Sequence, residues 1–197
     1  MKIVKYPHPA LRFPAKPVSS IDKEIRLLAG QMLELMYGNK GLGLAAPQVA
    51  VPVQLMVMNF AGEAEQKDKE CIAVNPVLID KKGVQEGEEG CLSFPGLYQK
   101  VRRAKTVTVR AYNLEGQLYE VVCSDLPARL WQHEIDHLHG RLFIDMMGPL
   151  GRHASRKMLE DFEDDYRTAQ KKGEYPSDDA IRKQLTEYGK AIPAPVM

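Results

Sequence analysis

The chain has 197 residues, of which 44% are hydrophobic and 27% charged, and its formal net charge is +1. This composition is that of a globular protein, and the near-zero charge gives no argument for a general attraction to nucleic acid or an anionic membrane. Its three cysteines have no close pairs, which makes a poor disulfide framework, and no apolar run approaches the roughly 20 residues of a membrane span. We therefore expect a cytoplasmic protein with no direct nucleic-acid or membrane partner.

The N-terminal part is predicted to be an extended segment followed by a helix. Four prolines within the first 18 residues favour irregular chain. Ser19 or Ser20 can cap a helix whose apolar residues recur at helical spacing, and Gly38 with Asn39 supplies its end. The glycines and proline of residues 41–48, Gly-Leu-Gly-Leu-Ala-Ala-Pro-Gln, argue against a long helix there.

The middle of the chain is predicted to be β-structure. Four segments are apolar or β-branched enough to predict strands: residues 53–58, 72–79, 106–112 and 117–122. The last two are joined by a turn at residues 113–116 and predict an antiparallel hairpin. Residues 62–70 are charged, and residues 83–90 are acidic and glycine-rich, so we expect loops in both places.

The C-terminal part is predicted to be helical. Asp125 is a good N-cap with Pro127 in the first turn, and the helix should run to about His139 with Gly140 as its end. Two further helices are expected over residues 152–170 and 177–190.

A metal site is indicated by His133-Glu134-Ile135-Asp136-His137. On a helix the two histidines lie about 40° apart around the axis, so both imidazoles can reach one metal. Glu134 follows His133 by about 100° and flanks the metal, where a general base would hold a water molecule. His139 points away and is interpreted as a surface or cap residue, while His8 and His153 have no motif around them.

The third metal ligand stays open on the residues alone. In the extended metalloprotease pattern Gly140 fits, but Phe143 stands where a third histidine is required. Glu160 on a later charged helix would make a zinc endopeptidase. Cys91, after the acidic glycine-rich segment, is the other candidate, whereas Cys71 and Cys123 read as strand residues.

Three segments together resemble the signature motifs of the peptide deformylases: residues 41–48, Glu-Gly-Cys-Leu-Ser at residues 89–93, and Gln-His-Glu-Ile-Asp-His-Leu at residues 132–138. They stand in the order and at the spacings of that family, and the resemblance covers roughly residues 1 to 165. It implies an α+β fold, with antiparallel β-sheets packed around a central helix that carries the His-Glu-x-x-His motif. It also implies removal of the formyl group from the N-terminal formyl-methionine of newly made polypeptides, releasing formate.

The resemblance assigns the metal site to Cys91, His133 and His137. It implies attack by a metal-bound water, with Glu134 as general acid/base. One divalent metal per chain is expected: Fe²⁺ in the cell, with Zn²⁺, Ni²⁺ or Co²⁺ as replacements. The expected class is therefore a metal-dependent hydrolase acting on linear amides, in the N-terminal processing step of protein biosynthesis.

The same resemblance gives Gln48 and the backbone N–H of Leu92 the task of holding the developing oxyanion, since fixed hydrogen-bond donors stabilise such charge. Gly43 would stand close to the substrate, where a side chain would obstruct it.

The sequence also offers residues for a substrate pocket. Formyl-methionine needs an apolar pocket, for which Leu42, Leu44, Leu126 and Leu130 are candidates, although each is equally credible as core. Peptides would bind in extended form along backbone edges near Gly43 and residues 87–89. Three further side chains are candidates for the pocket rim: Tyr98, Arg129 and Trp131.

Residues 1–170 are predicted to form the catalytic domain, and residues 171–197 a C-terminal helical appendage that is not an independent domain. Its alternating charges favour a solvated helix. Contact with a second copy of the chain, or transient contact with the ribosome where substrates emerge, are the alternatives. A structural metal site without catalysis is the non-enzyme alternative for the chain as a whole.

Overall fold

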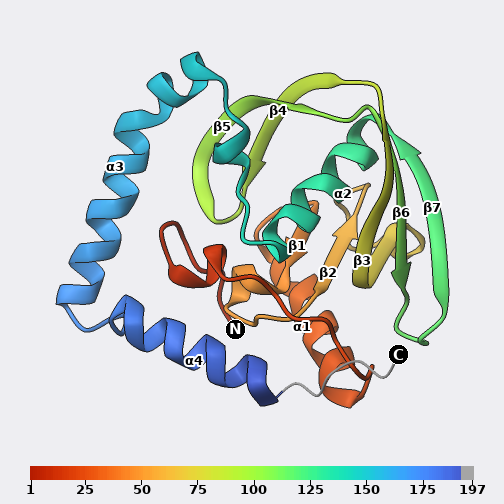
Figure 1. Cartoon of the computed structure of the whole chain (residues 1–197), viewed down its shortest axis with the longest axis horizontal. Coiled ribbons are helices and arrows are strands. Elements are labelled where there is room, and N and C mark those ends of the chain that lie inside the picture. The colour runs from red at the N-terminus through yellow and green to blue at the C-terminus, as the bar shows by residue number, and fades with distance from the viewer. Residues whose placement is uncertain (192–197) are drawn as a thin grey trace.

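Two antiparallel sheets enclose one helix in the computed structural model, which describes residues 1–191 (Figure 1). The strands are β1 (Gly43–Ala45), β2 (Leu55–Asn59), β3 (Glu70–Lys82), β4 (Gln85–Cys91), β5 (Phe94–Arg103), β6 (Thr106–Tyr112) and β7 (Leu118–Ser124). The α-helices are α1 (Lys23–Gly38), α2 (Asp125–Leu138), α3 (Pro149–Lys171) and α4 (Asp178–Ala191). Short 3-10 helices are η1 (Pro9–Arg12), η2 (Ala46–Val49), η3 (Lys67–Lys69) and η4 (Phe143–Met146). The expected α+β class, with antiparallel sheets around the helix that carries the histidines, is confirmed.

The larger sheet has the strand order β1-β2-β3-β6-β7, and its two faces are covered by different helices. Alternation along β2 produces this, because successive side chains of a strand point to opposite faces. Leu55 and Val57 pack into the cluster with α1, whereas Met56 and Met58 pack into the cluster with α2. Both faces are therefore apolar, and the sheet is the middle layer between the two helices.

Helix α2 packs its apolar face against the five-stranded sheet, so its histidines lie on the face that points away from that sheet. Ala128, Trp131, Ile135 and Leu138 recur at helical spacing and are all buried in the sheet cluster. The helix ends at Leu138, one residue before the predicted end at about His139, and the following Gly140 has a φ of +68°, which suits glycine. The face that carries the histidine motif is thus presented to the second sheet, the ribbon of β4 and β5, which arches over α2 (Figure 1).

The prediction of a loop over residues 83–90 is wrong, because most of this segment forms β4. Strand β5, which follows it, was not predicted. The segment carries glycines and glutamates, which have low strand propensity. Two of its glycines are needed for packing. A Cβ on Gly87 would lie 2.8 Å from Arg129 Nη2, and a Cβ on Gly90 would collide with the Tyr98 ring. The segment is a strand because it pairs with β5, and its glycines leave room for the Arg129 and Tyr98 side chains.

Element boundaries differ from expectation at several points. The cap of α1 is Asp22, whose Oδ1 accepts the N–H groups of Glu24 and Ile25 at 2.9 and 3.0 Å. The N-cap position of α2 is Ser124, and Asp125 is its first residue. Strand β3 extends beyond the predicted residues 72–79 at both ends because it pairs with β2 and then with β6.

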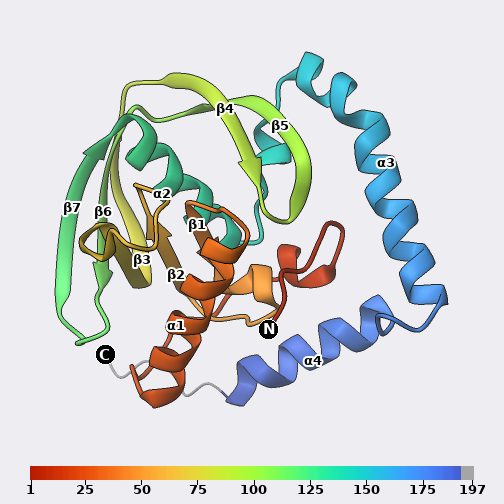
Figure 2. The same ribbon diagram turned by 180° about the vertical axis from the view of Figure 1, so that it is seen from behind.

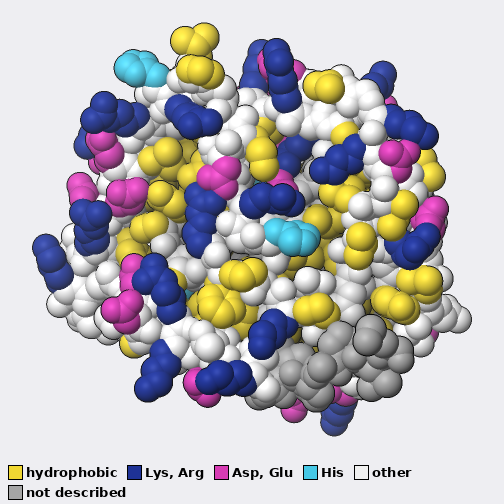
Figure 3. Space-filling view, in the orientation of Figure 1, with side chains coloured by type: hydrophobic (Ala, Val, Ile, Leu, Met, Phe, Trp, Pro, Cys, Tyr) yellow, Lys and Arg dark blue, Asp and Glu magenta, His cyan; other side chains and the backbone are white. Residues whose placement is uncertain are grey.

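Helices α3 and α4 form an arm at the edge of the molecule, and α4 returns towards the N-terminal segment (Figures 1 and 2). Ile181 and Leu185 of α4 are buried with Leu11 of η1 and Phe143 of η4. The last six residues of the expected appendage, 192–197, lie outside the described part of the chain. No helix within residues 1–191 has the length and apolar character that crossing a membrane requires. Charges of both signs are interspersed with apolar side chains on the face drawn in Figure 3.

Candidate metal and catalytic site

Cys91 at the end of β4 meets the two histidines of α2. One donor atom from each of Cys91, His133 and His137 lies within 4.8 Å of the other two. Cys91 Sγ is 3.3 Å from His137 Nε2, and the two imidazole centroids are 5.0 Å apart. A thiolate with two imidazoles is a donor set that suits zinc or iron, and three protein ligands leave one position for a reactant. The residues present therefore fit a divalent cation.

Glu89 is a member of this site whose role sequence reasoning missed. It is buried, and its Oε2 lies 3.0 Å from His133 Nδ1. With Nδ1 held by a carboxylate, the other ring nitrogen, Nε2, is the one left for a metal. Glu89 and Cys91 are two residues apart on β4, and both side chains reach histidines of α2. Recognising residues 85–91 as a strand would have pointed to Glu89.

Glu89 is held as an anion by its neighbours. Arg103 of β5 donates to both of its carboxylate oxygens at 2.9 Å and also pairs with Asp136 of α2. Burial alone would raise the pKa of the Glu89 carboxyl, but hydrogen bonds from His133 and Arg103 hold it well below its usual range. The same network ties the β4–β5 ribbon to α2 by charge.

Glu134 lies beside the trio with very different surroundings. It is 2% exposed, and no described residue makes a hydrogen bond to its Oε2. Burial raises the pKa of its carboxyl to about 7. A carboxyl with that pKa can both accept and release a proton near neutrality, which is what a general acid/base requires.

Gly43 on β1 makes room for Glu134. A Cβ at this position would collide with the Glu134 carboxylate, with Cδ only 2.8 Å away. The family resemblance predicts that Gly43 leaves space for the substrate. The observed neighbour is the glutamate, and contact between Gly43 and a substrate stays a prediction.

Gln48 of η2 is fully buried, and its amide is oriented by its neighbours. Its Oε1 accepts the N–H of Ala45 at 2.8 Å, so its NH₂ group faces the other way. That NH₂ group lies 3.4 Å from Cys91 Sγ and 3.3 Å from Ser93 Oγ. Leu92 follows Cys91 directly, at the turn between β4 and β5. Gln48 thus presents hydrogen-bond donors at the metal trio.

A cavity of about 440 Å³ opens on this site. Leu42, Leu126 and Leu130 line it, together with His133 and Glu134. The fourth predicted pocket residue is elsewhere: Leu44 is completely buried in the cluster with α1. The reason is strand alternation, since Leu44 points to the opposite face of β1 from Gly43 and Ala45.

Of the three candidates for the pocket rim, two line the cavity and one belongs to the core. Tyr98 is 61% exposed and lines the cavity, as does the buried Arg129. Trp131 is buried in the sheet cluster.

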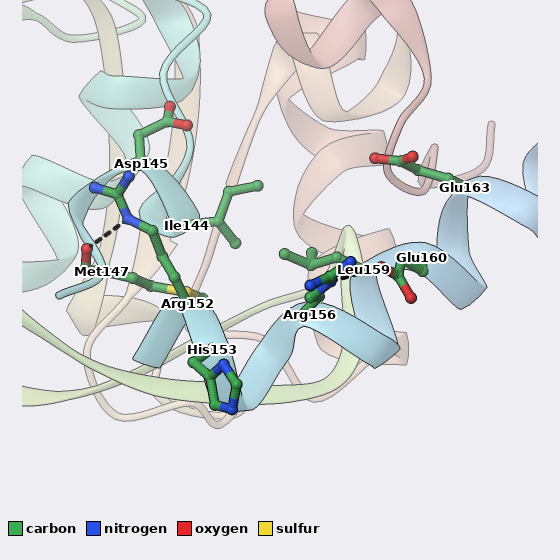
Figure 4. A pocket seen from close by; sticks show the side chains of 9 residues that line it. All are labelled: Ile144, Asp145, Met147, Arg152, His153, Arg156, Leu159, Glu160 and Glu163. Atoms are coloured by element: carbon green, nitrogen blue, oxygen red, sulfur yellow. Dashed lines mark hydrogen bonds and ion pairs between the residues drawn. The ribbon is translucent and has the colours of Figure 1, made fainter. Parts of the chain in front are cut away.

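A second cleft, of about 500 Å³, lies between η4 and α3 and holds none of the metal trio (Figure 4). Exposed His153 and Glu160 line it. Glu160 pairs with Arg156 on its own helix at 2.9 Å. The carboxylate considered as a third ligand is thus committed to a surface ion pair.

The remaining histidines agree with their interpretation as structural residues. His139 is the C-cap of α2, with its Nδ1 2.8 Å from the Ile135 carbonyl oxygen. His8 caps η1, where its Nδ1 accepts the N–H of Ala10.

Comparison with known proteins agrees with this geometry. A family model described as polypeptide deformylase matches residues 1–153. A peptide deformylase of Rhodopirellula baltica is 37% identical over 188 residues, covering 95% of this chain and 93% of the relative. One of Acidobacterium capsulatum is 47% identical over 150 residues, covering 76% and 88%. A plant peptide deformylase structure superposes with a TM-score of 0.84 at 42% identity, covering 90% of this chain and 95% of that one. The chain therefore belongs to the polypeptide deformylase family, whose members are metal-dependent hydrolases.

Proposed function

We propose that the chain removes the formyl group from the N-terminal formyl-methionine of newly made polypeptides and releases formate. One observation carries the proposal: a Cys-His-His trio lies beside a buried glutamate, whose Oε2 has no hydrogen-bond partner among the described residues, and beside an oriented glutamine amide. Gln48, Cys91, His133 and Glu134 line one cavity. Family membership supports the choice of reaction.

In this proposal Cys91, His133 and His137 hold one divalent ion. When bound, such an ion supplies a Lewis acid and an activated water. We propose ferrous iron as the native ion, and zinc, nickel or cobalt as ions that the same donors accept. Glu89 keeps His133 in the required tautomer by occupying Nδ1.

Glu134 carries the proton. Its carboxylate accepts a proton from the water that attacks the formyl carbon and delivers it to the departing amine nitrogen. Burial raises the pKa of this carboxyl to about 7, which suits both transfers, because near neutral pH the group can bind a proton and release it again.

Gln48 and Leu92 stabilise the charge that develops on the formyl oxygen. The Gln48 NH₂ group is fixed in direction by the bond from Ala45, so it needs no reorganisation when charge develops. The backbone N–H of Leu92 is the second proposed donor. Losing one such donor typically costs about 3–4 kcal/mol of transition-state stabilisation.

The methionine side chain is proposed to lie among Leu42, Leu126 and Leu130 in the cavity, and the following residues to extend along β1 and β4. Residues beyond the first would then be recognised through their backbone. A cytoplasmic location and a transient contact with the ribosome stay predictions.

The test combines formate release with metal content. Protein purified without oxygen should contain one iron per chain and release formate from formyl-Met-Ala-Ser. Cys91→Ala should lose both properties, and Cys71→Ala, which removes a half-buried cysteine elsewhere, should keep both.

The alternatives make different predictions for the same variants. A zinc endopeptidase using Glu160 would keep its metal in Cys91→Ala and lose it in Glu160→Gln. A purely structural metal site would bind metal in the wild-type protein without any formate release. Either result would overturn the proposed function.

A further inference from the structure

The metal trio is divided between two elements that no β-ladder joins. Cys91 ends β4, and the two histidines stand on α2. In the described part of the chain, β4 pairs only with β5, and this ribbon is not hydrogen-bonded to the five-stranded sheet as a strand. Side chains that connect the ribbon to α2 therefore contribute to the distance from the thiol to the imidazoles.

Arg129 is one of these connections, and it starts from α2, one helical turn before His133. Its side chain is buried, and its Nη1 donates to Glu89 Oε1 at 2.7 Å and to the Val101 carbonyl at 3.1 Å. Its Nη2 donates to the Gln85 carbonyl at 3.5 Å. One guanidinium thus contacts both strands of the ribbon and the carboxylate that orients His133.

Gly87 is what admits this guanidinium. It pairs with Val101 across the ribbon. A Cβ added to Gly87 would lie 2.8 Å from Arg129 Nη2, 3.0 Å from Cζ and 3.2 Å from Nε, with no other atom among its nearest contacts. Its φ lies outside the left-handed region, so the backbone itself accepts alanine. The absence of a side chain at residue 87 therefore leaves room for the Arg129 guanidinium.

We propose that Arg129, admitted by Gly87, is a positioning residue that locks the β4–β5 ribbon onto α2 and so sets Cys91 at its distance from His133 and His137. The inference rests on the metal site of the proposed function. Arg103 makes a parallel connection from β5 to Glu89 and Asp136. Arg129 adds the contacts to the backbone of both strands, which a carboxylate pair alone does not supply.

The experiment is a double-mutant cycle read out by metal binding. Zinc affinity is measured by competition with a chelator for the wild-type protein, Gly87→Ala, Arg129→Ala and the double variant. Loss of a group that supports a metal ligand typically weakens metal affinity about 10-fold or more. We expect about 10-fold weakening in each single variant. The double variant should be no weaker than Arg129→Ala, because truncation removes the atoms that the new methyl group displaces.

A second readout separates positioning from general stability. The visible absorption of the cobalt-substituted protein reports ligand geometry, and it should change in both single variants. Two controls should leave affinity and spectrum unchanged: Gly30→Ala, where nothing lies within 4 Å, and Arg110→Ala, which removes an exposed ion pair with Glu120.

Three outcomes distinguish the inference from the proposal beneath it. If wild-type protein binds no zinc, the metal site itself fails. If wild type binds zinc and both single variants keep its affinity and cobalt spectrum while losing thermal stability, Arg129 is only structural and the inference fails. Equal additional weakening by Gly87→Ala in the Arg129→Ala background would also overturn it, because the glycine would then act independently of the arginine.

Discussion

Two buried glutamates of the site show how partners decide the chemistry of one side-chain type. Glu89 receives hydrogen bonds from His133, Arg103 and Arg129, and its carboxyl pKa is held well below the usual range. The Oε2 atom of Glu134 accepts no hydrogen bond from residues 1–191, and burial raises the carboxyl pKa to about 7. When their environments shift the pKa values of two carboxyl groups in opposite directions, one group stays an anion and the other can carry a proton. We assign the first task to Glu89 and the second to Glu134.

Glu134→Gln tests this assignment, because it keeps the shape of the side chain and removes its ability to take a proton. Formate release should fall by about 10² to 10⁴-fold, the usual contribution of a general acid/base. Zinc content and the melting temperature should stay near wild type. Glu160→Gln, an exposed glutamate on α3, is the matched control. Formate release within tenfold of wild type in Glu134→Gln would contradict the mechanism.

At the scale of elements, the site depends on strands with unusual sequences. Strand β4 has no β-branched or aromatic residue, and it is held by its ladder with β5 and by side chains that cross its glycines. Strand β1 has only three residues, yet all are buried because it lies between α1 and α2. These strands position Cys91 and Glu134, so we expect small changes in the strands to alter formate release.

Gly43→Ala is the sharpest test of β1. The new methyl group would displace the Glu134 carboxylate, so we expect formate release to fall at least about tenfold, by the loss of general acid/base geometry. Overpacking should lower the free energy of unfolding by about 1–3 kcal/mol in a urea titration. Gly30→Ala on α1, with open space around it, should leave formate release unchanged. Full activity in Gly43→Ala would show that Glu134 does not need this space.

At the scale of the whole molecule, the two ends of the described chain pack together. Leu11 near the N-terminus shares a core cluster with Ile181 and Leu185 of α4. We therefore propose that the segment after residue 170 is no independent domain and that its helix completes the core of the preceding one. The alignment with the Rhodopirellula relative over 95% of this chain supports a fold that includes it.

Leu185→Ala measures how much α4 contributes. Deleting a buried leucine typically lowers the free energy of unfolding by about 2–5 kcal/mol, through lost apolar burial and the cavity left behind. Leu185 is 5% exposed, so we expect a loss in this range by urea unfolding. Lys183→Ala, an exposed neighbour, should change stability by less than about 0.5 kcal/mol. If Leu185→Ala lowered the free energy of unfolding by less than about 1 kcal/mol, α4 would be a solvated appendage and not part of the core.

His8 gives the whole molecule a pH dependence. The pKa of its imidazole is lowered from 6.5 to about 4, chiefly by burial, with Asp178 opposing this shift and Lys2 adding to it. The unfolded chain thus binds a proton at higher pH than the folded one, and stability is lost as pH falls from about 6.5 to 4. The loss should reach up to about 3 kcal/mol.

His8→Asn separates this effect from other acid-sensitive groups. The asparagine oxygen can accept the N–H of Ala10 as Nδ1 does, but it does not titrate in this range. Urea unfolding at pH 7 and pH 4.5 should show a smaller difference for the variant than for wild type. The same difference in both proteins would exclude His8 as the source.

Local patterns of the sequence were sufficient wherever one element decides the outcome. The spacing of His133, Glu134 and His137 follows from helix geometry alone, and Gly140 ends that helix by its own conformational freedom. The hairpin of β6 and β7 was predicted from its own turn and alternation. The resemblance of three short motifs was enough to indicate the family and to single out Cys91.

Only the tertiary structure decided what depends on neighbours from distant parts of the chain. It made residues 85–91 a strand, turned Leu44 to the α1 face and gave Glu89 its three cationic or imidazole partners. It also brought Arg129 across Gly87 to the ribbon that carries Cys91. The physical reason is that propensity and periodicity describe a residue's own element, whereas burial, pKa and steric space are set by side chains that arrive from other elements.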